Sequence, residues 1–422
     1  MNKSSEYSGF YKLTPEERLK FVIEFANLSP EDAKILSTPG CLGIETANGM
    51  IENVIGTMEL PLGVAVNFLI NGKDYVIPMA LEEPSVIAAV SNMAKTARIC
   101  GGFITSSTDP IMIAQIQLTN VPNPEKAKEK ILVEKDSLIK LANTQDPILV
   151  KFGGGARDLE VRIIDSEIGP MVITHLLVDC RDAMGANAVN TMAEALAPRI
   201  EELTGGRVYL RILSNLAKYR LARAEVSVTP EVIGGEDVVN GIIEAHEFAK
   251  VDPFRCATHN KGIMNGIDAV IIATGNDFRA IEAGAHAYAT LKGGYQPLTD
   301  WEKDENGNLK GTIEVPMAVG LIGGAVKVHP VARTNVNILG VKTANELGEI
   351  VAAVGLAQNM GALRALATTG IQHGHMRLHA RNVAITAGAP PELVEKIVEI
   401  MIKEKKVRVD RAEEIIKELT SQ

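Results

Sequence analysis

The chain has 422 residues, of which 46% are hydrophobic and 23% are charged, and its formal net charge is −9. This length exceeds one ordinary hydrophobic core and predicts two or three domains of a globular protein. The negative charge argues against a broad nucleic-acid surface. An anionic ligand must therefore be bound by local basic groups and backbone N–H groups.

Targeting signals and cysteine frameworks are not expected. No stretch approaches about 18 uninterrupted apolar residues, and the first residues lack the apolar core of a secretory signal, so we expect a cytoplasmic protein without a membrane segment. The cysteines lie far apart and without a CxxC spacing, at Cys41, Cys100, Cys180 and Cys256. They predict reduced thiols rather than a zinc site or a disulfide framework.

The N-terminal region predicts two short helices followed by a hairpin. Thr14 and Ser29 are each followed by proline and acidic residues, which is the pattern of a capped helix start. Residues 53–80 are strand-like, and Asn71-Gly72 between apolar runs predicts a type I′ turn. The hairpin leads into LEEPS, after which helical spacing begins, so Glu83 is expected at a helix N-terminus.

The middle of the chain has the element order β-α-β-β-α-β, which is the order of a ferredoxin-like unit. The expected elements are strand 111–118, helix 124–142, strand 158–166, strand 170–179, helix 186–204 and strand 207–214. We interpret this region as a small inserted domain.

Nucleotide binding in this region needs a separate argument, because the Rossmann fingerprint GxGxxG is absent from the sequence. A predicted strand runs instead into RDAMGAN, where Gly185 precedes a helix and can present backbone N–H groups to a phosphate. A plain strand-to-helix turn is the alternative. The glycine run at 153–155 suits a close-approach loop and a flexible connector equally.

Two further stretches carry candidate catalytic residues. THNKGIMNG sets Lys261 among small and turn-forming residues, and a predicted buried strand over 269–273 leads to Asp277 just beyond its end. A cation and carboxylates brought to loop ends by buried strands suggest reaction chemistry. A surface turn lysine and a helix N-cap at Asp277 are the structural alternatives.

Residues 344–368 predict one very long helix that forms the spine of a large domain.

Three histidines in QHGHMRLHARN introduce the C-terminal region. The spacing of His373, His375 and His379 has no HExxH pattern and no nearby cysteine, so one functional histidine is expected rather than a metal site. The charged, amphipathic text after His375 predicts two or three small helices with little core of their own. This tail is a candidate mobile cap.

Together these elements predict an α+β fold. A large mixed α/β domain around the long helix is expected to span residues 1–109 and 219–374. The ferredoxin-like nucleotide-binding domain is expected at 110–218, inserted into the large domain, and a small helical flap at 375–422.

Seven motifs occur in the order that is known from one enzyme family. They are ENVIGTMELPLG, LEEPSVIAA, DAMGANAVNTMAE, THNKGIMNGIDAVIIATGND, PMAVGLIGGA, GLAQNMGALRAL and GIQHGHMRLHARN. From about Leu13 to its end the chain resembles the 3-hydroxy-3-methylglutaryl-coenzyme A (HMG-CoA) reductases, and specifically their soluble bacterial and archaeal class, class II. The resemblance includes both the inserted domain and the C-terminal tail.

The resemblance implies a four-electron reduction of a thioester to an alcohol by two successive hydrides from NAD(P)H, through a hemithioacetal and an aldehyde. The products are mevalonate, free coenzyme A and oxidised nicotinamide, and mevalonate catabolism would run the reverse reaction at the same site. On matching positions, Lys261 stabilises the developing oxyanion and Glu83 handles a proton at the carbonyl oxygen. Asp277 links these two residues, and His375 protonates the departing coenzyme A thiolate.

The resemblance also implies the residues that bind the substrate and the cofactor. Ser85, Arg255 and Asn265 are assigned to the acid and hydroxyl groups of the substrate. The nicotinamide nucleotide is assigned to the DAMGAN motif and to a nearby asparagine, that is, to Asp182, Met184, Gly185, Asn187 and Asn215. Asp146 matches an acidic position associated with NAD preference, because a carboxylate accepts from the ribose 2′-hydroxyl and repels a 2′-phosphate. A turn aspartate is the alternative.

The family further implies a homodimer, or a higher assembly of dimers, whose active site is completed by two chains, with NADH preferred, NADPH possible and no metal. Two rival interpretations stay open: a Schiff-base lyase that acts on an acyl-CoA through Lys261, and a nucleotide-binding protein without chemistry. The joint presence of DAMGAN and GHM disfavours the lyase, which needs neither.

Overall fold

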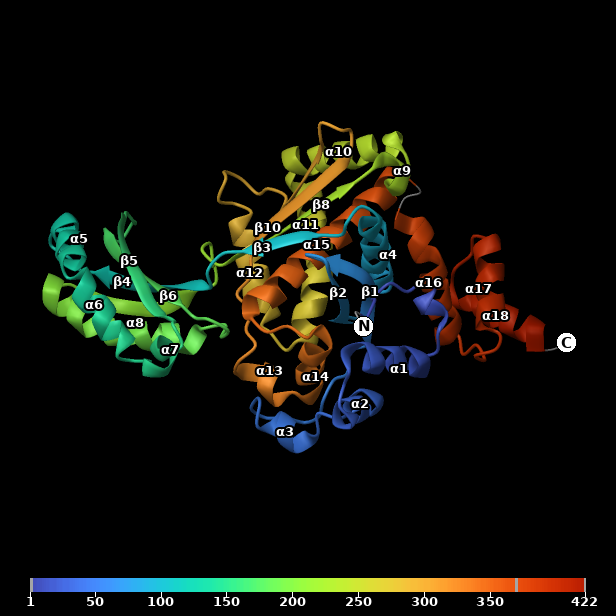
Figure 1. Cartoon of the computed structure of the whole chain (residues 1–422), viewed down its shortest axis with the longest axis horizontal. Helices are drawn as coiled ribbons and strands as arrows, with labels where there is room; N and C mark the ends of the chain where they lie inside the picture. The colour runs from blue at the N-terminus through green and yellow to red at the C-terminus, as the bar shows by residue number, and fades with distance from the viewer. Residues whose placement is uncertain (1–2, 369–370, 421–422) are drawn as a thin grey trace.

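The computed structural model describes residues 3–368 and 371–420, without the side chains of residues 371–378. A central body lies between two smaller parts (Figure 1). One of them is a four-stranded sheet with its helices, and the other, on the opposite side of the body, consists of three C-terminal helices. Helices and antiparallel strands are mixed along the chain, which confirms the predicted α+β fold.

The first part of the central body is a hairpin covered by helices. Its elements are the 3-10 helix η1 (Phe10–Lys12), α1 (Pro15–Ala26), α2 (Pro30–Ser37), α3 (Ile44–Asn48), β1 (Leu62–Ile70), β2 (Lys73–Ala80), α4 (Val86–Ile99) and β3 (Ile104–Ser107). The hairpin prediction is confirmed, since Asn71 and Gly72 have φ of 48° and 75° and connect antiparallel β1 and β2. Both predicted capped helices also form, as α1 and α2.

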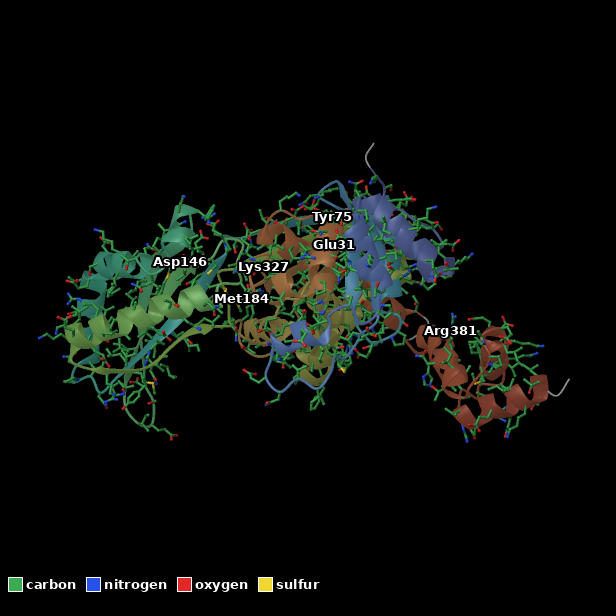
Figure 2. All side chains as sticks on the ribbon, turned by 90° about the horizontal axis from the view of Figure 1, so that it is seen from below. Glu31, Tyr75, Asp146, Met184, Lys327 and Arg381 are labelled. Atoms are coloured by element: carbon green, nitrogen blue, oxygen red, sulfur yellow. The ribbon has the colours of Figure 1, made fainter. Side chains whose placement is uncertain are left out.

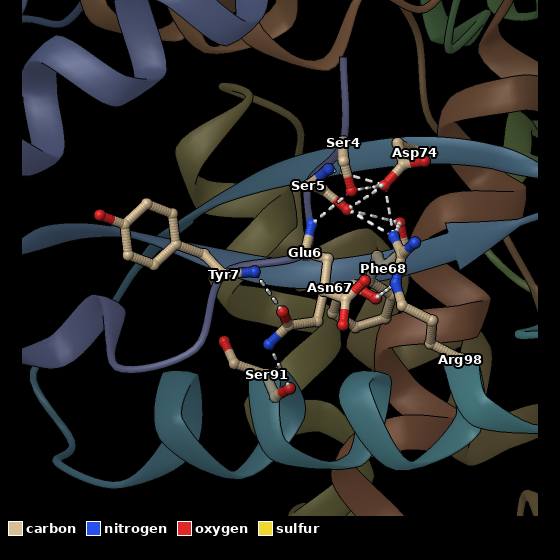
Figure 3. Close-up of polar contacts among 9 residues, drawn as sticks. All are labelled: Ser4, Ser5, Glu6, Tyr7, Asn67, Phe68, Asp74, Ser91 and Arg98. Carbon is tan, nitrogen blue, oxygen red and sulfur yellow. Dashed lines mark hydrogen bonds and ion pairs between the residues drawn. The ribbon is translucent and has the colours of Figure 1, made fainter. Parts of the chain in front are cut away.

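Polar contacts fasten the N-terminal segment to this hairpin (Figure 3). The Asp74 carboxylate accepts hydrogen bonds from the backbone N–H of Ser5 at 2.6 Å and from its hydroxyl at 2.8 Å. Asp74 also pairs with Arg98 in the last turn of α4. The contacts therefore fix α4 against the hairpin, and with it the segment between β2 and α4 that contains Glu83.

The small four-stranded part has the predicted ferredoxin-like topology. Its elements are β4 (Ile111–Thr119), α5 (Pro124–Val133), α6 (Lys135–Asn143), α7 (Pro147–Lys151), β5 (Gly155–Ile164), β6 (Met171–Asp179), α8 (Ala186–Thr204) and β7 (Arg207–Ser214). The antiparallel strand order is β5-β6-β4-β7. The single helix predicted over 124–142 is wrong in detail, because it is divided at Glu134 into α5 and α6.

The second part of the central body contains a four-stranded sheet and the longest helices. Its elements are β8 (Leu221–Val228), α9 (Pro230–Ile233), α10 (Glu236–Val251), α11 (Pro253–Ala273), α12 (Phe278–Tyr288), β9 (Thr299–Lys303), β10 (Leu309–Pro316), α13 (Gly324–Val328), α14 (Pro330–Leu339) and α15 (Ala344–Ala367). The antiparallel strand order is β3-β8-β10-β9. The predicted spine helix is confirmed as α15.

The predicted strand over 269–273 is wrong, and so is the loop around Lys261. Both segments belong to α11, which begins at Pro253 and is N-capped by the side chain of Asp252. Most residues of the apolar run 269–273 are buried. A buried helix turn has no amphipathic period, so its sequence pattern resembles that of a buried strand. Lys261 therefore lies near the middle of a 21-residue helix.

Glycines in α11 and α15 serve close helix packing rather than turns. A Cβ on Gly266 would lie 3.0 Å from the Cβ of Gln358, and a Cβ on Gly355 would lie 3.0 Å from the side chain of Ile267. The missing side chains let the two helices approach each other. The glycine-containing segment around Lys261 has low helix propensity. It is helical because packing against α15 stabilises it.

Helix α15 packs against α11, α10, α4 and the β3-β8-β10-β9 sheet. Among the helices that the structure describes, it is the one long and apolar enough to cross a membrane. Most of it is buried inside the protein, which is the position of a core helix.

The C-terminal part consists of α16 (Ile371–Thr386), α17 (Val394–Lys403) and α18 (Val409–Thr420). The prediction of helices is confirmed, but the prediction of little core is wrong. Ala380, Ile397, Met401 and Ile415 belong to an apolar cluster that is separate from the main core. The strongly amphipathic faces of α17 and α18 build this cluster.

Candidate active site

The segment between β2 and α4 presents Glu83 and Ser85 at a helix N-terminus, as expected. Ser85 takes the N-cap position of α4 with φ of 77°, a left-handed conformation that is uncommon for serine. Its hydroxyl makes no capping hydrogen bond, and the buried Oγ has no partner among the described residues. A buried hydroxyl without a partner is costly, so Ser85 is suited to bind a ligand.

Lys261 and Glu83 meet although they are far apart in the sequence. Lys261 Nζ donates a hydrogen bond to Glu83 Oε2 at 3.0 Å, and Asn265 Nδ2 donates to the same oxygen at 3.3 Å. Lys261 and Asn265 are four residues apart and therefore lie on one face of α11. The Lys261 side chain is 62% exposed, so the pair faces an open surface of this chain.

Arg255 occupies the first turn of α11. Its backbone N–H donates to the Asp252 cap at 2.7 Å, but its half-buried guanidinium makes no hydrogen bond or ion pair with the described residues. Burial lowers the pKa of Arg255 from its usual value, although a guanidinium remains protonated. The side chain is a forked cation that can bind a carboxylate.

Asp277 does not join Lys261 and Glu83 within this chain. Its carboxylate caps α12 by accepting from the N–H of Arg279 at 3.0 Å and from that of Ala280 at 3.2 Å, and it also pairs with the Arg279 side chain at 3.0 Å. It follows the C-terminal end of α11, roughly 18 Å along the helix axis from Lys261. The structural alternative, a helix N-cap, is therefore observed for Asp277.

His375 belongs to α16, but its side chain lies outside the described residues, as does that of His373. Among the described residues, no group of three or more histidine, cysteine, aspartate and glutamate side chains could hold a metal ion. The predicted role of His375 stays a prediction.

The turn before α8 opens the helix with a glycine, as predicted. Gly185 has φ of 103°, and an added Cβ would lie 2.3 Å from Cys180 Sγ, so the position requires glycine. No side chain of the described residues caps α8. Asp182 lies in the same turn, but its Oδ1 accepts from the N–H of Ala344 at 2.7 Å at the start of α15.

The remaining predicted cofactor residues belong to the same small part. Asn187 in α8 and Asn215 after β7 are both exposed, and no hydrogen bond is formed by either side chain with the described residues. Asp146 caps α7, since its Oδ1 accepts from the N–H of Leu149 at 2.9 Å. Figure 2 shows Met184 beside the central body and Asp146 within the small part.

A carboxyl pair that the sequence analysis missed lies beside the candidate site. The side chains of Asp268 and Glu282 share a hydrogen bond, and Glu282 also pairs with His286 at 2.7 Å. Burial, and then Glu282, raise the pKa of Asp268 to about 8. Asp268 is seven residues from Lys261 and on the same helix face. If residues 253–273 had been predicted as one helix, the seven-residue spacing would have placed Asp268 on the same helix face as Lys261.

Comparisons with known proteins agree with this arrangement. The family model for hydroxymethylglutaryl-coenzyme A reductase matches residues 14–380. The 3-hydroxy-3-methylglutaryl-coenzyme A reductase of Archaeoglobus fulgidus is 62% identical over 418 residues, which are 99% of this chain and 95% of that protein. The corresponding reductase of Borreliella burgdorferi, named as probable, is 38% identical over 79% of this chain and 77% of its own length.

Solved structures extend the similarity to the fold. The reductase of Streptococcus pneumoniae matches with a TM-score of 0.85 at 42% identity, over 98% of this chain and 100% of that chain. A structure of the class II reductase from the same organism, bound to NADPH in open conformations, matches with a TM-score of 0.84 at 42% identity over 86% of this chain and 100% of that chain.

The comparisons give no support to the lyase alternative. They support an oxidoreductase with a nicotinamide cofactor. The chain therefore belongs to the hydroxymethylglutaryl-coenzyme A reductase family, in its class II, and reduces HMG-CoA.

Proposed function

We propose that Lys261 and Glu83 are the residues at which HMG-CoA is reduced. Hydride transfer to a thioester carbonyl leaves negative charge on its oxygen, and a fixed ammonium group beside that oxygen stabilises the charge without reorganisation. Glu83 accepts a hydrogen bond from Lys261 and is in reach of the same oxygen for proton transfer. The 3.0 Å contact between Lys261 Nζ and Glu83 Oε2 is the observation that carries this proposal.

Three polar groups near this pair suit the rest of the substrate. The forked guanidinium of Arg255 matches the substrate carboxylate, and the hydroxyl of Ser85 matches an oxygen acceptor or donor; neither group has a partner among the described residues. Asn265 already donates to Glu83 and keeps a carbonyl oxygen for the substrate hydroxyl.

A homodimer explains why Asp277 is distant from Lys261 within one chain. We propose that Asp277 acts on the Lys261–Glu83 pair of a second copy across a two-fold axis. Exposed apolar side chains support an interface, because large ones gather between residues 44 and 62: Ile44, Met50, Ile51, Ile55, Met58, Leu60 and Leu62.

Each of the outer parts has a proposed task in this scheme. Residues 110–218 bind the nicotinamide nucleotide through Met184, Gly185, Asn187 and Asn215, while residues 1–109 and 219–374 carry the reacting groups. When bound, the nucleotide supplies the hydride. The uncapped N–H groups of α8 are suited to its phosphates, and the free oxygen of Asp146 suits a ribose 2′-hydroxyl, which favours NADH.

The C-terminal part completes the proposal. Residues 375–422 close over the site as a flap, and His375 protonates the coenzyme A thiolate, for which a group titrating near neutrality is suited. We further propose that the enzyme is cytoplasmic. The same site serves synthesis and breakdown of mevalonate, so an assay of both directions with NADH and NADPH decides the preferred one.

Mixed dimers test the sharing of the site between two chains. Lys261→Ala and Asp277→Ala should each be inactive, but refolding the two together should restore about a quarter of the wild-type rate, because half of the dimers are mixed and each has one intact site. Mixing Lys261→Ala with Glu83→Gln is the matched control. These two residues contact each other within one chain, so no activity should return. Equal restoration in both mixtures, or in neither, would contradict the shared site.

A further inference from the structure

A buried arginine that the proposed mechanism does not use lies behind the turn at the start of α8. Arg220 is 3% exposed and lies where the chain returns from β7 to β8. Its Nη1 donates to the carbonyl oxygens of Ala183 at 3.0 Å and Met184 at 3.2 Å, and its Nη2 donates to that of Val319 at 2.5 Å. All three partners are neutral backbone groups.

Arg220 forms no ion pair with the described residues, although the carboxylates of Asp182 and Asp179 are near enough to favour its charged form. The neighbouring carboxylates have other partners: Asp179 pairs with Arg181 at 2.5 Å, and Asp182 accepts from the N–H of Ala344. Burial lowers the pKa of Arg220, but a guanidinium keeps its proton in proteins. A buried charge that forms no ion pair is costly, so a guanidinium at this position suggests a function that requires its charge.

The bonds from Arg220 also set the direction of the backbone in this turn. In a trans peptide the N–H points opposite to the preceding carbonyl, so fixing the Met184 carbonyl directs the Gly185 N–H away from Arg220. The N–H groups of Gly185, Ala186 and Asn187 make no hydrogen bond with the described residues. The positive charge therefore lies on one side of the turn and a set of free donors on the other.

We propose that Arg220 is a positioning residue for the cofactor: it holds the turn at 182–185 so that its N–H groups meet the nucleotide phosphates, and its buried charge is the counter-charge to them. This inference rests on the proposed assignment of the nucleotide to this turn. A guanidinium behind the turn adds to the positive end of the α8 dipole, and burial keeps it from being screened by salt.

The turn is also held from the side of the central body. A Cβ on Gly320 would lie 2.5 Å from the backbone nitrogen of Met184, and the N–H of Leu321 donates to the carbonyl of Asp182 at 2.8 Å. Met184 indeed lies at the junction of the small part with the central body (Figure 2). Gly320→Ala should thus displace the turn while leaving the charge of Arg220 in place.

Calorimetric titration of the full chain with NADH and with NADPH, without HMG-CoA, tests the proposal. Arg220→Met should raise the Kd for both nucleotides at least about tenfold, while the Kd for HMG-CoA stays within about twofold of wild type. The loss should persist at about 0.5 M salt, because a buried charge is weakly screened. Arg211→Met, which removes an exposed arginine of β7, is the matched control and should leave both affinities unchanged.

Further variants keep the test decisive if Arg220→Met does not fold. Arg220→Lys keeps the charge but loses the fork, so the Kd for the nucleotides should rise roughly threefold or more, and Gly320→Ala should raise it with all charges present. Folded variants that bind both nucleotides as tightly as the wild type would overturn the proposal, whatever their stability. If the wild type itself binds neither nucleotide, the cofactor assignment fails instead.

Discussion

The Lys261–Glu83 pair and the turn before α8 differ in how completely one chain builds them. Lys261 is 62% exposed, and the Ser85 hydroxyl nearby has no partner among the described residues. In the turn, by contrast, the carbonyls of residues 182–184 are all bonded, and a buried arginine lies behind them. In the proposed function this difference has a reason: the turn binds a phosphate group of fixed shape and is already formed, whereas the reacting pair is completed by the substrate and by a second chain.

The largest expected effect concerns the Lys261–Glu83 pair, which is the incompletely built region of the two. Lys261→Ala should lower kcat at least about a hundredfold, because removing one donor from a developing oxyanion costs about 3 to 4 kcal/mol. The exposed side chain contributes little to stability, so the melting temperature should stay unchanged. Steady-state rates with HMG-CoA and thermal unfolding measure both quantities. Lys250→Ala, which removes an exposed lysine of α10, is the control; a similar rate in the two variants would remove Lys261 from the chemistry.

The prebuilt turn is tested by Gly185→Ala. The new Cβ would lie 2.3 Å from Cys180 Sγ, in a backbone with φ of 103°. We expect the Kd for NAD(P)H to rise about tenfold and the free energy of unfolding to fall by roughly 1–3 kcal/mol. Gly169→Ala separates the effect of backbone strain from that of the clash in the turn. Gly169 also has a positive φ, of 111°, but a Cβ added there would have nothing within 4 Å. Equal loss of nucleotide affinity in both variants would mean that the turn is not the binding element.

The carboxyl pair beside the reacting residues predicts a pH effect on stability. Because Asp268 has a raised pKa, of about 8, in the folded protein, its contribution to stability is fully present below the unfolded pKa and is lost as pH rises through about 8. The other titratable groups in contact are Glu282 and, through it, His286. Asp268→Asn should lack this loss.

Urea unfolding at pH 5 and pH 9 measures the effect of Asp268. Between these values the wild type should lose at least about 1.4 kcal/mol relative to Asp268→Asn, which corresponds to one pKa unit. Asp136→Asn, at an exposed position of α6, should follow the wild type. If Asp268→Asn also follows it, the carboxyl does not keep its proton at neutral pH.

The same two regions show what the sequence could predict. The small sheet follows from alternating apolar strands and turn residues, which are local signals, and all four of its strands were predictable. Helix α11 was not predictable, because Gly262 and Gly266 resemble turn residues, and the close approach of α15 at Gly266 is a tertiary contact. The approach of Lys261 to Glu83 was expected only from the family, since nothing local relates residues so far apart. Arg220 was missed because its burial depends on segments that are distant in sequence.

The smallest expected effect concerns Asp146, where the capping and cofactor roles can be separated. Asp146 Oδ1 accepts from the N–H of Leu149, which leaves the second carboxylate oxygen for a ribose hydroxyl. Asp146→Asn keeps a capping acceptor but removes the charge, so the ratio of kcat/KM for NADH to that for NADPH should fall severalfold with unchanged stability. Asp146→Ala should lower this ratio similarly and also cost about 1 kcal/mol of stability. If only the alanine variant changes, and only in stability, the cap accounts for Asp146 entirely and the determinant of cofactor preference lies elsewhere in the small part.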